Sequence, residues 1–280
     1  MAIDIGNTNI KVGVIDLNSN KDKFNLVTGF RLTTTQNLTS DELGIRIKAI
    51  LRDNINRVNP YKMNAILCSS VVPKLNHTIY NMSRRYLGHT PYFINTDYNL
   101  GMKISYSNPS EIGADRIVNA VAVNEIYQAP SIIIDFGTAT TFCALSKGKG
   151  YLGGVIVPGL LISLDALSEK AAKLPQVELV HPSQVIGDST REAMVSGAFY
   201  STVGTIEKVC KLMKEEILEK DKSLKDMNPS EIKVVATGGI ANFIAQKTEL
   251  IDIVDPLLTL RGILEIYNKN LDRFSIGEKV

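Results

Sequence analysis

The sequence lacks the residues that would support a disulfide framework or a structural zinc site. It contains no tryptophan, three cysteines, three histidines and no Cys-x-x-Cys pair. Because Cys68, Cys143 and Cys210 are odd in number and far apart, we expect reduced, buried thiols of a cytosolic protein. The three histidines have no metal-ligand spacing between them, which argues against zinc.

The sequence also lacks a long apolar run and an excess of charge of one sign. Its longest uncharged stretch, residues 151–164, is too short to cross a bilayer and contains three glycines and a proline. The formal net charge is +2, and the densest charge run, 214–226, alternates in sign as on the solvated face and end of a helix. We therefore expect no membrane segment and no nucleic-acid partner. Because Met1 leads into an apolar strand without a basic segment or cleavage signal, we expect a cytoplasmic protein.

What remains is the composition of a soluble α/β protein with room for two domains. The 280 residues are 44% hydrophobic and 21% charged, and that length can bury two cores. Short β-rich runs alternate with helical patterns, which we expect over 40–54, 77–88 and 110–130. Pro130 ends the last of these helices.

A strand–turn–strand pattern occurs twice. When residues 131–145 are laid over the start of the chain, Asp135 falls on Asp4 and Gly137 falls on Gly6. The offset of 131 residues is close to half the chain. Internal similarity at this spacing suggests two related halves. The turn after Gly6 is short enough for a β-hairpin.

Each repeated turn has the chemistry of a phosphate site. A carboxylate at the end of a buried strand needs a cation or hydrogen bonds to compensate its burial. The glycine lets the backbone approach a ligand closely, and the N–H groups and polar side chains after it can donate to phosphate oxygens. Asp4 can hold Mg²⁺, usually through water. Two such turns would grip a triphosphate, although a pair of ordinary hairpins with polar turns is the alternative.

Two further features have two readings each. Lys11, just beyond the first turn, either reaches a phosphate or lies on an exposed strand face. Residues 234–239 form a β-rich run that ends in two glycines, which suits close approach of an adenine ring but also a plain strand-to-helix turn. Neither the P-loop pattern nor Gly-x-Gly-x-x-Gly occurs, so the sequence does not support those nucleotide sites.

These turns, in this order, resemble the phosphate 1, phosphate 2 and adenosine motifs of the actin, Hsp70 and sugar-kinase superfamily. Within it, nearly the whole chain resembles the type III pantothenate kinases. The shared segments are DIGNTN (4–9), SSVVP (69–73), GADR with a later Asn (113–116 and Asn119), DFGTATT (135–141), YLGGVIVPGL (151–160), LP (174–175), GDSTREAMVSG (187–197) and DPLLTLRGILEIY (255–267). The chain departs from the family pattern in a short first strand and a long stretch at 220–231.

The resemblance implies an α/β fold of two related actin-like (ribonuclease H-like) domains, 1–112 and 113–280. Each would have a mixed sheet flanked by helices, with ATP in the cleft between them. The implied reaction is ATP-dependent phosphorylation of the 4′-hydroxyl of pantothenate to 4′-phosphopantothenate, the first step of coenzyme A biosynthesis. The implied enzyme is a homodimer with sites at the interface, which uses Mg²⁺ with the nucleotide and K⁺ or NH₄⁺ as activator.

The resemblance also implies roles for particular residues. Asp115 is the base that accepts the hydroxyl proton, and Asp135 binds the monovalent cation. The ATP-binding residues are Asp4, Ile5, Gly6, Asn7, Thr8, Asn9, Ile10, Lys11 and Thr138. The pantothenate-binding residues are Tyr106, Gly113, Ala114, Asp115, Arg116 and Thr190. Thr190 is expected to reach the substrate of the partner chain.

The GADR residues suit these roles chemically. Asp115 stands near a helix start, where the helix dipole favours its ionised form, and Arg116 offers a forked donor for a carboxylate. From the residues alone, Asp115 could instead cap the helix and Arg116 could be solvated. One competing function is a kinase for a sugar or another carboxylate, which would need different substrate-side motifs. The other is a regulatory binding protein, which should have lost Asp115 or a turn aspartate.

Overall fold

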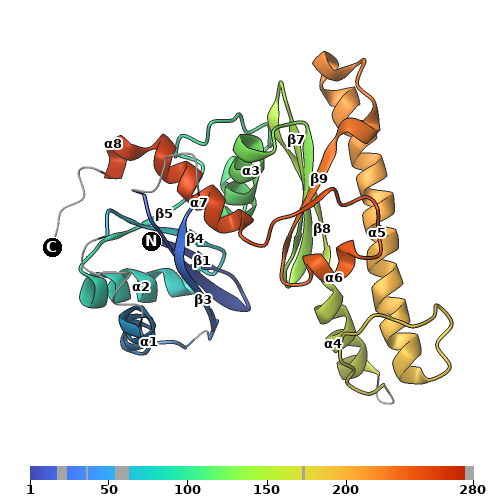
Figure 1. Cartoon of the computed structure of the whole chain (residues 1–280), viewed down its shortest axis with the longest axis horizontal. Coiled ribbons are helices and arrows are strands. Elements are labelled where there is room, and N and C mark those ends of the chain that lie inside the picture. The colour runs from blue at the N-terminus through green and yellow to red at the C-terminus, as the bar shows by residue number, and fades with distance from the viewer. Residues whose placement is uncertain (18–23, 36, 54–62, 172–173, 275–280) are drawn as a thin grey trace. The chain divides into compact units, whose positions relative to one another are not determined.

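A computed structural model describes residues 1–17, 24–35, 37–53, 63–171 and 174–274 (Figure 1). The chain forms two compact units, each with one five-stranded sheet. Unit 1 consists of Met1–Met102, Ser107–Glu125 and Leu258–Val280, and unit 2 consists of Lys103–Tyr106 and Ile126–Leu257. Most of unit 2 is thus one insertion, for which the chain leaves unit 1 after Glu125 and returns at Leu258.

The two sheets have the same strand order and the same strand directions. The order is β3-β2-β1-β4-β5 in unit 1 and β8-β7-β6-β9-β10 in unit 2. In each sheet the first strand pairs antiparallel with the second and parallel with the fourth. This shared topology confirms the two related halves, and the helix-flanked mixed sheets confirm the expected fold class.

The strands are short, as in most globular domains. Those of unit 1 are β1 (Ala2–Ile5), β2 (Asn9–Ile15), β3 (Leu26–Thr33), β4 (Ile66–Ser70) and β5 (Pro91–Phe93). Those of unit 2 are β6 (Ser131–Phe136), β7 (Ala139–Ser146), β8 (Gly150–Pro158), β9 (Lys233–Gly238) and β10 (Ile253–Val254). The expected hairpin of β1 and β2 is confirmed.

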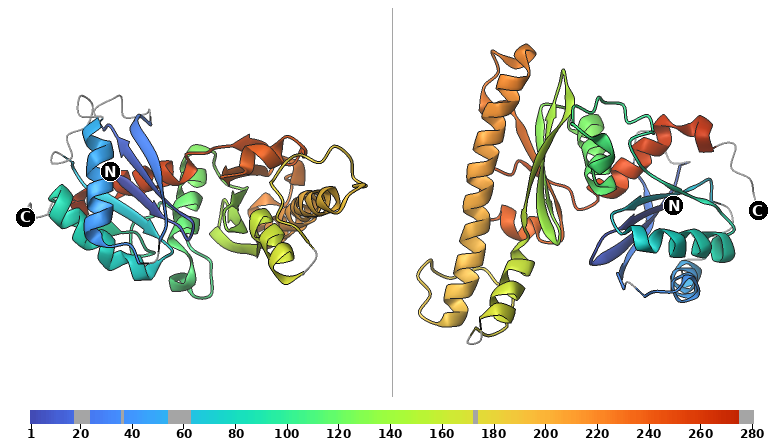
Figure 2. Two further views of the ribbon diagram at one scale, coloured as in Figure 1. Left: turned by 90° about the horizontal axis from the view of Figure 1, so that it is seen from below. Right: turned by 180° about the vertical axis from the view of Figure 1, so that it is seen from behind.

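The core of unit 1 surrounds the central strand β1, whose four residues are all buried. Ile3 and Ile5 pack in one cluster with apolar residues of the helices α1 (Ser40–Asp53) and α2 (Pro73–Met82). Because side chains alternate along a strand, Asp4 points to the opposite face. The helix α7 (Leu258–Lys269) contacts β1 and β4 (Figure 2).

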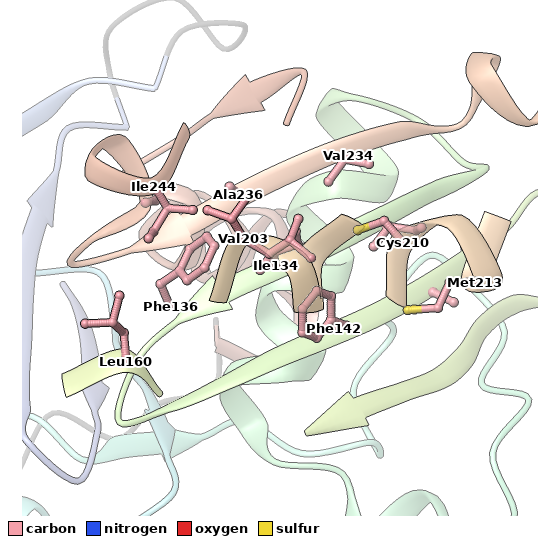
Figure 3. Packing of buried hydrophobic residues seen from close by; sticks show 14 of the residues in the cluster. Ile134, Phe136, Phe142, Leu160, Val203, Cys210, Met213, Val234, Ala236 and Ile244 are labelled. Carbon is pink, nitrogen blue, oxygen red and sulfur yellow. The ribbon is translucent and has the colours of Figure 1, made fainter. Parts of the chain in front are cut away.

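The core of unit 2 lies between its sheet and the helix α5 (Thr190–Lys220), which has 31 residues. Figure 3 shows Ile134 and Phe142 of the strands facing Val203 and Cys210 of α5. Two shorter helices, α4 (Leu160–Lys170) and α6 (Ala241–Ala245), add apolar residues to the same cluster. Leu160 and Ile244 are the contributions that Figure 3 labels.

The helices that carry sequence motifs begin and end differently from the expectation. The helix expected over 110–130 is α3 (Ala114–Ile126), and Gln128, with φ of 68°, turns the chain before Pro130. The helix expected over 77–88 begins at Pro73, a residue suited to a first helical turn. It continues as a π-helical stretch, Ser83–Leu87, and ends at Gly88 in a left-handed conformation. The last helix is α8 (Leu271–Phe274).

From the sequence we expected reduced cysteines, no zinc site and no membrane segment. The described residues give the following findings on each. Cys68, Cys143 and Cys210 are all buried and none forms a disulfide, as predicted. In the part of the chain that the structure describes, no group of three or more His, Cys, Asp or Glu could hold a metal ion. Over the same residues, no helix has both the length and the apolar character needed to cross a membrane.

Candidate active site

The first phosphate turn joins β1 to β2 and is closed by backbone hydrogen bonds. The N–H of Gly6 donates to the carbonyl of Asn9 at 3.0 Å. Thr34 ties the turn to β3, because its hydroxyl donates to the Gly6 carbonyl at 2.7 Å and its N–H donates to the Thr8 carbonyl at 2.9 Å. A Cβ atom on Gly6 would lie 3.2 Å from the Asn9 oxygen. Asn7 and Thr8 are exposed at the tip, where a ligand can meet them.

Asp4 is the one polar residue of β1 and is only 6% exposed. Lys11, its cross-strand partner on β2, places Nζ 3.4 Å from Asp4 Oδ2. Burial raises the pKa of the Asp4 carboxyl, and the Lys11 ammonium opposes that rise. Lys11, on β2, thus directs its ammonium to the Asp4 carboxylate and is only partly exposed.

Asp115 lies in the first turn of α3. Its Oδ1 accepts a hydrogen bond from the Arg116 N–H at 2.7 Å. Burial raises the pKa of Asp115, whereas this hydrogen bond and the charges of Arg116 and Lys11 oppose the rise. A Cβ atom on Gly113 would lie 2.6 Å from Asp115 Oδ1 and 3.4 Å from Val71. Glycine therefore leaves the space that the Asp115 carboxylate occupies.

The structure brings the first turn and the GADR segment together within unit 1. The charge of Asp115 raises the pKa of Asp4, and the charge of Lys11 lowers the pKa of both carboxyls. The buried Asp4 carboxylate and the partly buried Asp115 carboxylate, from distant parts of the sequence, thus both feel the charge of Lys11. Arg116 is 8% exposed, so the reading of Arg116 as a solvated side chain is wrong.

Ser69 is a site residue to which the sequence analysis gave no role. The parallel pairing of β1 with β4 puts Ser69 beside Asp4, and Ser69 is fully buried. In unit 2 the equivalent pairing puts Thr237, 2% exposed, beside Asp135. A hydroxyl in an otherwise apolar, buried strand is the sequence signal that could have identified both residues.

The second phosphate turn, in unit 2, repeats the construction of the first. The Gly137 N–H donates to the carbonyl of Ala139 at 3.2 Å, and the Gly159 N–H donates to the carbonyl of Thr138 at 3.1 Å. A Cβ atom on Gly159 would lie 2.4 Å from the Thr138 oxygen, so this approach requires glycine. Asp135 faces Thr141 across the strands, at the position where Asp4 faces Lys11.

The glycine pair after β9 adjoins this second turn. Gly238 is paired with Phe136 of β6, and the N–H of Gly239 donates to the Phe136 carbonyl at 3.2 Å. Gly238 has φ of 100°, and a Cβ atom there would lie 2.4 Å from the Phe136 oxygen. Gly238 and Gly239 thus end β9 and begin the connection to α6, beside the strand that leads into the second phosphate turn.

The other two expected substrate residues, Tyr106 and Thr190, belong to unit 2. The ring of Tyr106 meets Tyr151 edge to face, with 6.1 Å between ring centroids. Thr190 is exposed and is the first residue of α5. Thr190 does not cap this helix, because Ser189 Oγ accepts the hydrogen bond from the Glu192 N–H at 3.3 Å.

Asp4 also fits the expected magnesium site. Mg²⁺ keeps several waters and takes one or two carboxylates together with substrate phosphates, so a cage of protein ligands is unnecessary. Asp4 supplies a buried carboxylate directly before a turn of exposed donors. The residues present are therefore suited to a hydrated Mg²⁺ that arrives with a nucleotide.

The fold and the two turns define the class of the protein. Two sheets of one topology, each with an aspartate on its first strand and a glycine turn after it, are the arrangement of an actin-like ATP-dependent phosphotransferase. A family model described as type III pantothenate kinase matches residues 1–212. The chain belongs to the type III pantothenate kinase family and is a phosphotransferase of coenzyme A biosynthesis.

Solved structures resemble nearly the whole chain. One is a Campylobacter jejuni protein named for the Baf family of transcriptional activators, with 21% identity, a TM-score of 0.57, and coverage of 97% of this chain and 98% of that one. A glucomannokinase from Arthrobacter sp. strain KM has 16% identity, a TM-score of 0.41 and 97% coverage of both chains. A ROK hexokinase from Thermus thermophilus has 15% identity, a TM-score of 0.45 and 96% and 98% coverage. The first of these extends the fold match past residue 212.

Proposed function

We propose that the chain transfers the γ-phosphoryl group of ATP to the 4′-hydroxyl of pantothenate, with Asp115 as the proton acceptor. The observation that carries this proposal is the group formed by Asp115, Asp4 and Lys11 within unit 1. The family supplies the two substrates. The three buried cysteines, none of which forms a disulfide, support the cytoplasm as the compartment.

ATP would be held by residues 4–11 and by Thr138 of the second turn. Exposed donors at the tip of the first turn face outward, and Lys11 adds a positive charge at its base. Asp4 would hold Mg²⁺ through water, and the ion would neutralise charge that develops on the phosphate oxygens. Backbone donors of both turns supply the rest of that stabilisation.

Asp115 is suited to accept a proton late in the reaction. Phosphoryl transfer passes through a loose transition state, so the acceptor hydroxyl need not ionise early. Burial raises the pKa of Asp115, which makes this carboxylate a stronger base than one in water. Arg116, buried beside it, offers a fork for the carboxylate of pantothenate. Gly113, Ala114 and Tyr106 complete the acceptor side.

The monovalent cation at Asp135 is proposed from the family resemblance. Asp135 stands at the end of β6 and is paired with Thr141 of β7, so its carboxylate adjoins the second turn. A carboxylate at this position is a suitable oxygen ligand for K⁺ or NH₄⁺.

The exposed surface of unit 2 supports a homodimer. Apolar side chains are exposed on α4 and α5, two helices that line a hollow of about 170 Å³ together with β7 and β8. They are Leu161 at 51%, Ile162 at 44% and Tyr200 at 39% exposed. Further along the chain, Ile186 is 85% exposed just before Thr190. An apolar surface of this kind suits a second copy of the chain, which would bring Thr190 to the partner's substrate.

The test is a coupled assay of ADP release with Mg²⁺ and ATP, with and without pantothenate. We expect release to depend on pantothenate, and to be supported by K⁺ or NH₄⁺ but not by Na⁺. Sugars and other hydroxy acids serve as control acceptors. Equal ADP release with and without pantothenate would refute the substrate, and equal rates in Na⁺ and K⁺ would refute the cation at Asp135.

A further inference from the structure

Two segments shared with the family have no role in the mechanism above, and the structure joins them. Thr259, at the start of α7, donates its hydroxyl to Asn119 Oδ1 of α3 at 3.0 Å. Thr259 is 4% exposed and Asn119 is 2% exposed. Both residues belong to unit 1, and Thr259 lies beyond the residues that the family model matches.

The Asn119 end of this hydrogen bond lies one helical turn after the proposed base, Asp115. Residues four positions apart on a helix share one face, so Asn119 follows Asp115 one turn further along the same stripe of α3. Arg116 precedes Asn119 by three positions and also adjoins it. Any shift of Asn119 along or around the helix would therefore move the Asp115 carboxylate.

The helix α7 is in turn held against the sheet that carries Asp4. It contacts β1 and β4, and a Cβ atom on Gly13 of β2 would lie 2.8 Å from Leu260. Ile3 and Ile5 point to α1 and α2, so Asp4 is on the other face of the sheet. The same alternation along β2 puts Lys11 there.

The helices α7 and α3 meet closely at Gly262 and are joined again by one ion pair. A Cβ atom on Gly262 would lie 2.0 Å from the Val118 carbonyl oxygen, so the two helix backbones touch there. At the far ends of the helices, Lys269 Nζ lies 3.0 Å from a Glu125 carboxylate oxygen. The helix α7 thus contacts both β1, the strand with Asp4, and α3, the helix with Asp115.

We propose that Thr259 and Asn119 are positioning residues, which set the separation between Asp115 and the Asp4–Lys11 pair. Their hydrogen bond fixes the rotation of α3 against α7, and α7 transmits the position of the sheet. The hydrogen bond also joins α3, after which the chain leaves unit 1, to α7, with which the chain returns to unit 1. The inference rests on the proposed role of Asp115.

The experiment compares Thr259→Val, which removes the hydroxyl at nearly constant volume, with Thr259→Ser, which keeps it. A small misplacement of a reacting group costs on the order of 10²-fold. We therefore expect Thr259→Val to lower kcat roughly tenfold to hundredfold, with the KM for ATP within about twofold of the wild type. Thr259→Ser should recover most of kcat.

Asn119→Ala is the second variant, in case Thr259→Val folds poorly. If the two residues act through their shared bond, Thr259→Val combined with Asn119→Ala should lose no more kcat than the worse single variant. The matched control is Ile79→Val, which removes one methyl group from the core of unit 1 on the α2 side. It should lower the melting temperature and leave kcat unchanged.

Hydrogen exchange of the α3 amides supplies a readout that needs no activity. Thr259→Val should speed exchange over residues 115–121 relative to α1, and Thr259→Ser should not. The inference is overturned if Thr259→Val keeps kcat within about twofold, or if Thr259→Ser is as slow as Thr259→Val. If the wild type shows no pantothenate-dependent turnover, the proposed function fails by itself. Unchanged α3 exchange in Thr259→Val then still overturns the positioning role.

Discussion

At the residue scale, the chemistry of unit 1 depends on the charges of Asp4, Asp115 and Lys11. Burial raises the pKa of both Asp4 and Asp115, and the Lys11 ammonium opposes both shifts. Asp115 further raises the pKa of Asp4, so the charges of the two carboxylates are coupled.

We predict that Asp115→Asn will bind ATP and lose on the order of 10²–10⁴ in turnover, the scale of a positioned base. The amide keeps an oxygen that can accept the hydrogen bond from the Arg116 N–H, so the helix start should persist. ATP binding is measured by calorimetry, since the chain has no tryptophan to report it. Glu111→Gln, an exposed substitution shortly before α3, is the control. A loss below tenfold would leave Asp115 as a structural residue.

At the scale of the elements, the long stretch at 220–231 is ordered by one carboxylate and one capping box. Asp221, at the end of α5, accepts hydrogen bonds from the Ser146 hydroxyl, from the Gly148 N–H at 2.8 Å, and from the Ser223 hydroxyl at 2.7 Å. These bonds hold the β7–β8 turn against the end of the helix. They also keep the pKa of Asp221 well below its usual range, with Ser146 as the largest cause and Ser223 next.

We predict that Asp221→Asn will lower the free energy of unfolding by about 1–3 kcal/mol at pH 7, because buried donors lose a charged acceptor. A depressed pKa stabilises the fold above the unfolded value of about 3.9 and ceases to do so as the pH falls below it. The difference between wild type and variant should therefore be constant from pH 7 to about pH 5 and shrink below about pH 4.

Urea unfolding across this pH range measures the effect. Asp226→Asn is the matched control, because Asp226 is exposed and lies five residues further along the same stretch. It should leave stability unchanged. An Asp221→Asn variant as stable as Asp226→Asn would show that the hydrogen bonds to Asp221 add nothing at pH 7.

At the scale of the whole molecule, the proposed active site needs a second chain. Thr190 is exposed at the start of α5, near the exposed apolar Ile186. On the same helix, Gly197 and Gly204 have open space where a Cβ atom would be, and they are seven positions apart on one helix face. These positions can therefore be changed without disturbing the packing within a single chain.

We predict that Gly204→Arg will give a folded, inactive monomer, because a long cation would project from the surface proposed to meet the second copy. Sedimentation measures the assembly and circular dichroism the fold. Glu219→Arg, roughly 22 Å further along α5 at 1.5 Å per residue, is the control and should stay dimeric and active. A dimeric and active Gly204→Arg would place the interface elsewhere.

A shared site also predicts complementation between two inactive variants. Asp115→Ala and Thr190→Val should each be inactive alone, whereas a mixed dimer keeps one site with both residues intact. Random exchange makes about half of the dimers mixed, so roughly a quarter of wild-type activity should return. If mass spectrometry shows exchange and activity stays at the level of the single variants, Thr190 does not act across the interface.

Much of the fold and of the site could be predicted from the sequence, because local chemistry decides these features. The repeat of Asp4-x-Gly6 at Asp135-x-Gly137 indicated two related halves, and both sheets have one topology. The sheet of unit 1 lies wholly within 1–112 and that of unit 2 within 113–280. The units themselves are not two consecutive segments, because Ser107–Glu125 and Leu258–Val280 belong to unit 1 and Lys103–Tyr106 belongs to unit 2. A glycine turn after a buried aspartate is a local pattern, and a local pattern is visible in a sequence.

Contacts between distant segments were decided by the tertiary structure. Nothing in the residues near Lys11 shows that it points to Asp4, since exposed and inward lysines on a strand look alike until the pairing is known. The same holds for Ser69 beside Asp4, and for the return of α7 to unit 1, where Thr259 meets Asn119. Strand register and helix packing make these contacts, and both depend on the burial of whole faces by segments far apart in the chain.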